Sequence, residues 1–268
     1  MGEAKIRQYS RKEFLKRHPI CCYCGATATT TDHCPPRSLF ERRSWPEGYE
    51  FPACDPCNDE GRENELVIAS LYRLSVARVD KHPNETKKLL QGLINNRRDV
   101  AAEWLSGTRN WQRGKLRETF GSPLGDMMQR QGYGVAALGN KTHEAMNYFG
   151  RKLGKALYYK HVGRRLIGQL LCRSIPLMEG RDLLQSSLRF APGIPRLERA
   201  SEELSDQFTY RYNVNKEVGV LFCAVGFKEQ IGYLLFAFEQ GFYDRNLEAH
   251  PDIEKKFEES FPCRHVCV

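Results

Sequence analysis

Two Cys-x-x-Cys pairs constrain the fold of this chain more than any other feature of its sequence. Cys21 and Cys24 form the first pair, and Cys54 and Cys57 form the second. One such pair can direct two thiolates at a single ion, and two pairs complete the tetrahedron of a closed structural zinc site. Residues 21–65 are rich in cysteine, proline and glycine and poor in apolar sequence, so they need a metal to fold. We therefore predict a structural zinc ion held by these four cysteines.

Two further cysteines near this site have a different expected role. Cys22 could in principle replace Cys21, but Cys21 is preferred because it leaves the two-residue gap. Cys22 and Cys34 are then packing residues or weakly reactive thiols. A closed four-thiolate zinc site has no open position and cannot activate water, so any catalysis must come from another centre.

Composition narrows the class of protein. The 268 residues include 41 lysines and arginines against 33 acids, and the net charge of +8 suits an anionic partner. No apolar run approaches the ~18–20 residues of a membrane span, and the polar start has no signal-peptide core. We therefore expect a soluble, cytoplasmic protein with no membrane partner, in which ten cysteines indicate metal binding rather than disulfides.

The pattern of apolar residues predicts an α+β fold with three regions. Residues 1–75 hold a basic, helical lead-in and the metal-organised module. Residues 76–190 carry apolar residues at three- and four-residue spacing, which predicts a mainly helical region. Prolines and a glycine at residues 191–196 predict a linker, and aromatic and β-branched runs in residues 197–268 predict antiparallel strands.

An Asp32-His33 step lies between the two cysteine pairs, and Asn58 directly follows the last cysteine. Folding around zinc would bring both segments close together. Asp32 and Asn58 offer hard oxygen ligands, which suit Mg²⁺ or Mn²⁺. An unperturbed histidine has a pKa of ~6.5, so His33 can accept a proton from water that attacks a phosphodiester. These residues predict a catalytic divalent ion and a histidine general base in addition to the zinc site.

Residues 18–70 also carry a family resemblance. The string CYCG…TTTDHCPPRSLF…FPACDPCNDEGRENE resembles the zinc-containing HNH (His-Me finger) endonucleases. The resemblance implies a ββα-metal unit, in which two strands and a helix surround one divalent ion. It implies that His33 is the general base and that Asp32 is a metal ligand. It gives Asn58 the family's second polar position, which either binds the metal or orients the histidine.

The final histidine of the family's motif has no counterpart here. No histidine occurs between His33 and His82, so Asn58 or an acid on the following helix must take that role. Similar sequences carry an acid at the position of Glu65, which we select as an additional ligand of the divalent ion. The acids that compete with it are Glu60 and Glu63. We expect the helix of the ββα-metal unit to begin near residue 64.

Basic residues supply candidate contacts with nucleic-acid phosphates. Three arginines follow the Asp-His step, where they could position a backbone without reading its sequence. A helix expected over residues 141–165 carries many more lysines and arginines than acids, which favours a nucleic-acid-binding surface over an ordinary solvated face. The candidate contacts are Arg37, Arg42, Arg43, Lys152 and Lys155.

We expect metal-dependent hydrolysis of nucleic-acid phosphodiester bonds, with DNA rather than RNA as the substrate. The resemblance adds a role in restriction or anti-phage defence. The C-terminal strands could read a target, bind an activating protein or form a homodimer, and we expect the activity to be regulated. Two alternatives stay open. One is a non-catalytic zinc-ribbon protein that binds nucleic acid or serves as an adaptor, and the other is a redox or adaptor protein with a reactive thiol at Cys22 or Cys34.

Overall fold

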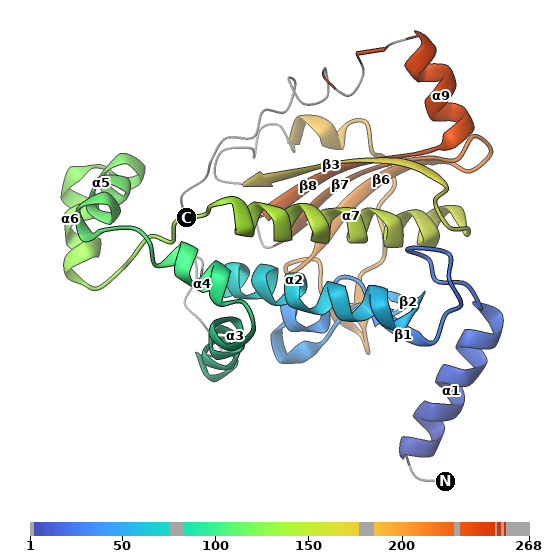
Figure 1. Cartoon of the computed structure of the whole chain (residues 1–268), viewed down its shortest axis with the longest axis horizontal. Coiled ribbons are helices and arrows are strands. Elements are labelled where there is room, and N and C mark those ends of the chain that lie inside the picture. The colour runs from blue at the N-terminus through green and yellow to red at the C-terminus, as the bar shows by residue number, and fades with distance from the viewer. Residues whose placement is uncertain are drawn as a thin grey trace.

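A long helix, α7 (Asn140–Val162), lies between an antiparallel sheet and the N-terminal helix α2 (Asp55–Leu74), as Figure 1 shows. The computed structural model describes residues 3–74, 83–176, 185–227, 231–249, 251–252 and 255. Its mixture of helices and antiparallel strands confirms the predicted α+β class. Residues 256–268 of the predicted C-terminal region lie outside the described residues.

The part of the chain that precedes α7 is mostly helical. Besides α2 it contains α1 (Glu3–Arg17), β1 (Thr30–His33), η1 (Arg37–Leu39), η2 (Glu41–Arg43), β2 (Glu50–Ala53), α3 (Pro83–Asn96), α4 (Arg98–Trp104), α5 (Arg109–Phe120) and α6 (Ser122–Arg130). The helix α1 confirms the helical lead-in. Across the described ranges, no helix combines the length and the apolar character needed to cross a membrane.

Two short strands and a helix form the predicted ββα unit. β1 and β2 pair antiparallel, with Asp32 opposite Phe51. We expected the helix to begin near residue 64, but α2 begins at Asp55, and this correction has a local cause. The Asp55 amide donates a hydrogen bond of 3.1 Å to Thr29 Oγ1, and Pro56 has no amide hydrogen that needs a partner in the first turn. The residues that follow Cys54 are therefore helical from the start.

The C-terminal part of the chain is built on a four-stranded sheet with the order β3-β8-β7-β6. All neighbouring strands are antiparallel, which confirms the predicted C-terminal strands. The elements are β3 (Gly168–Pro176), β4 (Glu198–Arg199), β5 (Glu202–Glu203), β6 (Thr209–Asn215), β7 (Val220–Phe227), β8 (Ile231–Glu239) and α9 (Gln240–Ala249).

Residues 168–176 form the strand β3 rather than the helix that we expected through residue 190. Gly163 ends α7 in the left-handed conformation, with φ 87°, and the chain then turns back over the helix. β3 pairs with β8 along its whole length, and this pairing overrides the helical pattern expected for this stretch. α7 lies close to this strand at Gly154. A Cβ atom at this position would lie only 2.8 Å from the Leu170 side chain.

One hydrophobic core joins the three predicted regions. Its buried members include Phe51 from the first region, Phe149 from the second and Tyr210 from the third. The expected linker is also bound to the folded part of the chain, since Gly193 exchanges backbone hydrogen bonds of 2.8 and 3.0 Å with Tyr212. The ββα unit therefore packs on elements that come from much later in the sequence.

His161, near the end of α7, ties this helix to β6. Its Nε2 lies 2.9 Å from the Tyr210 hydroxyl, and its ring stacks on Tyr212 with 3.8 Å between the ring centroids. Burial, together with the nearby cations of Lys160 and Lys216, lowers the pKa of His161 from 6.5 to about 4.

This lowered pKa predicts a loss of stability in mild acid. The unfolded chain binds a proton at His161 below a pH of about 6.5, whereas the folded protein resists protonation down to about pH 4. The free energy of unfolding should therefore be highest above pH 6.5 and fall between these two values, by ~2 kcal/mol after allowance for solvent screening. Urea unfolding of the wild type and of His161→Phe at about pH 7.5 and about pH 4.5 checks this.

The phenylalanine keeps the ring contact but has no proton to bind, so the wild type should lose more stability than the variant. Because the other groups titrate alike in both proteins, the difference between them reports on His161. The same pH dependence in both proteins would contradict the expectation.

Candidate functional site

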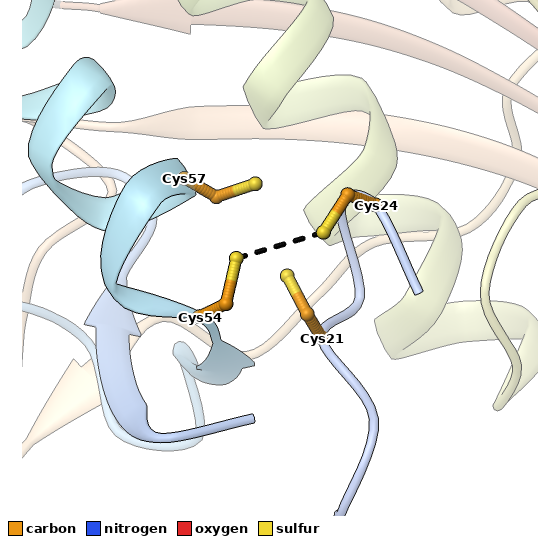
Figure 2. A group of neighbouring side chains, drawn as sticks. All are labelled: Cys21, Cys24, Cys54 and Cys57. Atoms are coloured by element: carbon orange, nitrogen blue, oxygen red, sulfur yellow. Dashed lines mark hydrogen bonds between the residues drawn. The ribbon is translucent and has the colours of Figure 1, made fainter. Parts of the chain in front are cut away.

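The four predicted cysteine ligands form one cluster, and Figure 2 shows their side chains pointing toward one another. Their sulfur atoms all lie within 4.8 Å of one another, and the sulfurs of Cys24 and Cys54 are 3.5 Å apart. Sulfurs on a tetrahedral zinc ion are separated by roughly 3.8 Å, given a Zn–S bond of about 2.3 Å. All four are free cysteines. The cluster can therefore hold a metal ion such as zinc.

A tight turn shapes the first half of this cluster. The Cys21 amide donates to the Ala26 carbonyl at 2.8 Å, and the Gly25 amide donates to the Cys21 carbonyl at 3.0 Å. Gly25 has φ 86°, a conformation that favours glycine. The Ala26 amide lies 3.5 Å from Cys24 Sγ and is the largest cause that lowers the pKa of this thiol to about 7. The turn thus favours the thiolate that metal binding requires.

Cys22 and Cys34 lie outside the cluster. Their exposed fractions are 1% and 0%, and burial raises the pKa of both thiols. A buried thiol with a raised pKa is a packing residue rather than a nucleophile. The reactive thiol of the redox alternative is therefore not found at either position.

The ββα unit brings the predicted catalytic residues to one cleft. The cleft has a volume of about 890 Å³, and its lining includes Asp32, His33, Asn58 and Glu65. Asp32 and His33 end β1, Asn58 lies in the first turn of α2, and Glu65 lies two turns further along this helix. The backbone amide of Asn58 donates a hydrogen bond to the Cys54 carbonyl at 3.1 Å. One helical turn therefore joins the cysteine cluster to the cleft.

Glu65 is the most enclosed of the acids that we considered on α2. Its side chain is 12% exposed, whereas Glu60 and Glu63 are exposed residues. Glu63 also lines the cleft, but Glu60 is not among the residues that line it. The choice of Glu65 over these two acids is therefore consistent with its place in the fold.

A lysine from α7 connects the two site carboxylates. Lys152 Nζ lies 2.8 Å from Asp32 Oδ2 and 2.6 Å from Glu65 Oε1. The Tyr23 hydroxyl donates to the same Asp32 oxygen at 2.7 Å. Burial lowers the pKa of Lys152, but the carboxylates of Glu65 and Asp32 outweigh it and leave the pKa raised, so the ammonium keeps its charge.

We expected Lys152 on an exposed basic face that contacts nucleic acid, and this prediction is wrong. Lys152 is 4% exposed, because its ion pairs compensate its burial and α7 turns this side toward α2. Lys155, one turn further, is half-buried and donates to the Tyr23 carbonyl at 3.3 Å. Its contact with nucleic acid stays a prediction.

His33 is held by an aromatic contact that the sequence did not indicate. Its ring is perpendicular to the Trp45 ring in a T-shaped contact, with 4.6 Å between the centroids. Trp45 Nε1 donates to Glu50 Oε1 at 3.1 Å, and Glu50 is the strand partner of His33. Burial, followed by the cation of Arg37, lowers the pKa of His33. The imidazole is therefore neutral near pH 7 and can accept a proton.

Several arginines line this cleft. Arg37 and Arg43, two of the predicted phosphate contacts, line the cleft, as do Arg11 and Arg62. Arg42 is exposed and lies outside the lining. Cations at these positions can contact the phosphates of a bound nucleic acid.

Arg199, from the C-terminal part of the chain, also reaches this site. Its guanidinium carbon lies 3.6 Å from the centre of the Trp45 ring, and its Nε donates to the Trp45 carbonyl at 2.8 Å. Sequence reasoning missed Arg199, Trp45 and Tyr23, because no motif marks them and their roles follow from contacts that only the folded chain makes.

Comparison with protein-family models, with curated proteins and with solved structures finds no match for this chain. Its function must therefore be argued from the chemistry of the cleft and of the cysteine cluster.

Proposed function

We propose that this protein is a metal-dependent endonuclease that hydrolyses phosphodiester bonds of nucleic acid, with DNA as the main substrate. The observation that carries the proposal is the meeting of Asp32, His33, Asn58 and Glu65 in one cleft beside a four-cysteine cluster. A carboxylate, an amide and a histidine at one site form the constellation that hydrolysis of a phosphodiester needs. A zinc-ribbon binding protein would have no use for it.

His33 is the general base in this proposal. Its neutral imidazole takes the proton of the attacking water, and the T-shaped contact with Trp45 fixes the direction of the ring. Arg37 and Arg43 bind neighbouring phosphates and hold the backbone in register. His33 and these two arginines line the same cleft, which supports this division of roles.

The oxygens of Asp32, Asn58 and Glu65 are hard ligands and would hold Mg²⁺ or Mn²⁺. Such an ion, when bound, stabilises negative charge on the phosphate and on the leaving oxygen. We assign zinc to the four cysteines, where it has a structural role, since a closed thiolate site has no position for water. The turn that carries Cys21 and Cys24 also carries Tyr23, which donates to Asp32. The zinc site thereby supports the cleft.

The resemblance to HNH endonucleases leads us to propose a cytoplasmic role in restriction or anti-phage defence. A nuclease that cut host nucleic acid at all times would harm the cell, so an activating partner, a modified target or a signal controls it. Rapid degradation of plasmid DNA by the purified protein without any addition would contradict this control.

The test of the proposed function is a cleavage assay with purified protein. Plasmid DNA, single-stranded DNA and structured RNA are each incubated with Mg²⁺, Mn²⁺ or a chelator that leaves the cysteine-bound metal in place. We expect cutting of DNA that requires Mg²⁺ or Mn²⁺, as hard oxygen ligands predict. Tight binding of nucleic acid without cutting under every condition, including addition of cell extract as a source of activator, would support the binding-protein alternative instead.

A further inference from the structure

Lys152 is a buried cation that pairs with two carboxylates of the proposed site, although it comes from outside the ββα unit. Its side chain is 3% exposed. Two carboxylates, on β1 and on α2, each bind its ammonium with one oxygen, at 2.8 and 2.6 Å. On a third side the ammonium lies 5.3 Å from the centre of the Tyr23 ring. A lysine enclosed in this way cannot reach a nucleic-acid backbone, so its role lies inside the site.

The helix that faces Lys152 is shaped to receive it. Gly61 is a buried residue in the interior of α2, where glycine is destabilising by ~1 kcal/mol relative to alanine. A methyl group at Gly61 would collide with Lys152 Nζ and would lie 3.0 Å from Cε and 3.3 Å from Glu65 Oε1. The glycine is therefore explained by the passage of the lysine, and both features belong to one built arrangement.

This arrangement assigns different roles to the oxygens of the two acids. Asp32 Oδ2 accepts from both Tyr23 and Lys152, and Glu65 Oε1 accepts from Lys152. The second oxygen of each carboxylate is not part of this network. The ammonium also cancels one of the two negative charges of the acid pair. Without it, the two enclosed carboxylates would repel each other and turn apart.

We propose that Lys152 is a positioning residue of the nuclease site. Its ammonium fixes the spacing and rotation of Asp32 and Glu65, so that their remaining oxygens face a divalent ion in the cleft. This inference rests on the proposed function. It adds to the site a residue of α7, a helix that lies outside the ββα unit. Partners that orient metal-binding carboxylates typically change activity by about 10–100-fold when they are removed.

The test compares Lys152→Met with the wild type by two measurements. Methionine retains the length and apolar stem of the side chain but has no charge. We expect the cleavage rate at saturating Mn²⁺ to fall ~10–100-fold. Mn²⁺ binding to the protein without nucleic acid, followed by electron paramagnetic resonance, should also weaken by ~10–100-fold, because the two acids lose the ammonium that sets their spacing.

The matched control is Lys141→Met, at an exposed position of the same helix, where the lysine pairs with Glu144 at 3.0 Å. It should leave both measurements unchanged. A Lys152→Met protein that cleaves at the wild-type rate or faster would overturn the proposal. A parallel loss of Mn²⁺ binding, cleavage and melting temperature would also overturn it, because it would indicate a role in folding alone.

Gly61→Ala supplies a second variant that retains the lysine. The added methyl group displaces the ammonium from the two acids, so cleavage should fall while the total charge is unchanged. This variant keeps the inference testable if Lys152→Met does not fold. If the wild type binds Mn²⁺ but cuts no substrate, the proposed function fails while the Mn²⁺ titrations still test the link between Lys152 and the acids. If all variants bind Mn²⁺ as tightly as the wild type, a link between Lys152 and the metal-binding acids is excluded.

Discussion

Replacing His33 with alanine is expected to slow phosphodiester cleavage by ~10²–10⁴-fold, the range for loss of a general base. The imidazole is the proton acceptor of the cleft, and its lowered pKa keeps it neutral where the reaction runs. Alanine removes this acceptor without touching the four cysteines or the acid pair with Lys152. The rate is measured on the best substrate of the cleavage assay at saturating Mg²⁺, so that a change in metal affinity does not contribute.

Two comparisons isolate this effect from a loss of structure. His33→Ala should retain its zinc and its affinity for nucleic acid, which is measured by fluorescence anisotropy. His143→Ala, in the first turns of α7, removes a histidine that is not among the residues lining the cleft, and it should leave the rate unchanged. Cleavage by His33→Ala within about threefold of the wild-type rate would contradict the assignment, since any general base contributes more than that.

Loss of the cysteine-bound metal is expected to unfold the ββα unit and abolish activity. Structural zinc contributes ~10–16 kcal/mol of binding free energy in small metal-dependent units. The whole stability of a domain is about 5–15 kcal/mol, so the unit cannot fold without its metal. Cys54→Ser should therefore release zinc and lower the melting temperature sharply. It should also remove cleavage, because the Cys54 carbonyl accepts a hydrogen bond from the backbone amide of Asn58 in the first turn of α2.

Cys22→Ala is the matched control for this experiment. Cys22 neighbours a ligand and is 1% exposed, but it does not belong to the cluster. Its replacement should keep one zinc ion per chain, as measured by elemental analysis, and cost only ~1 kcal/mol as a small core truncation. Retention of zinc and activity by Cys54→Ser would show that the cluster does not have the structural role proposed for it.

The parts of the fold that could be predicted are those set by local signals. The spacing of the cysteines anticipated the cluster, since each Cys-x-x-Cys turn is formed by its own few residues. The runs of β-branched and aromatic residues anticipated β6, β7 and β8. Local patterns of this kind, together with the helical spacing of apolar residues, are enough to predict the α+β class.

The parts that could not be predicted depend on contacts between distant segments. Lys152 resembled other basic residues of α7, and only the packing of this helix on α2 shows that it is buried between two acids. Arg199 meets Trp45 across more than half of the chain. β3 is a strand because β8 lies beside it, although the apolar pattern that leads into it predicted a helix. Local patterns carry no signal for such partners.

The distance in sequence between Glu65 and Lys152 has a consequence for synthesis of the protein. These two residues are 87 positions apart, and a ribosome adds roughly 5–20 residues per second, so roughly 4–17 s pass between their additions. All four cysteines of the cluster have been made before this interval begins, but the acid pair still lacks its cation. A nascent chain thus carries an incomplete cleft, and the site is completed only after α7 has been made and has packed against α2.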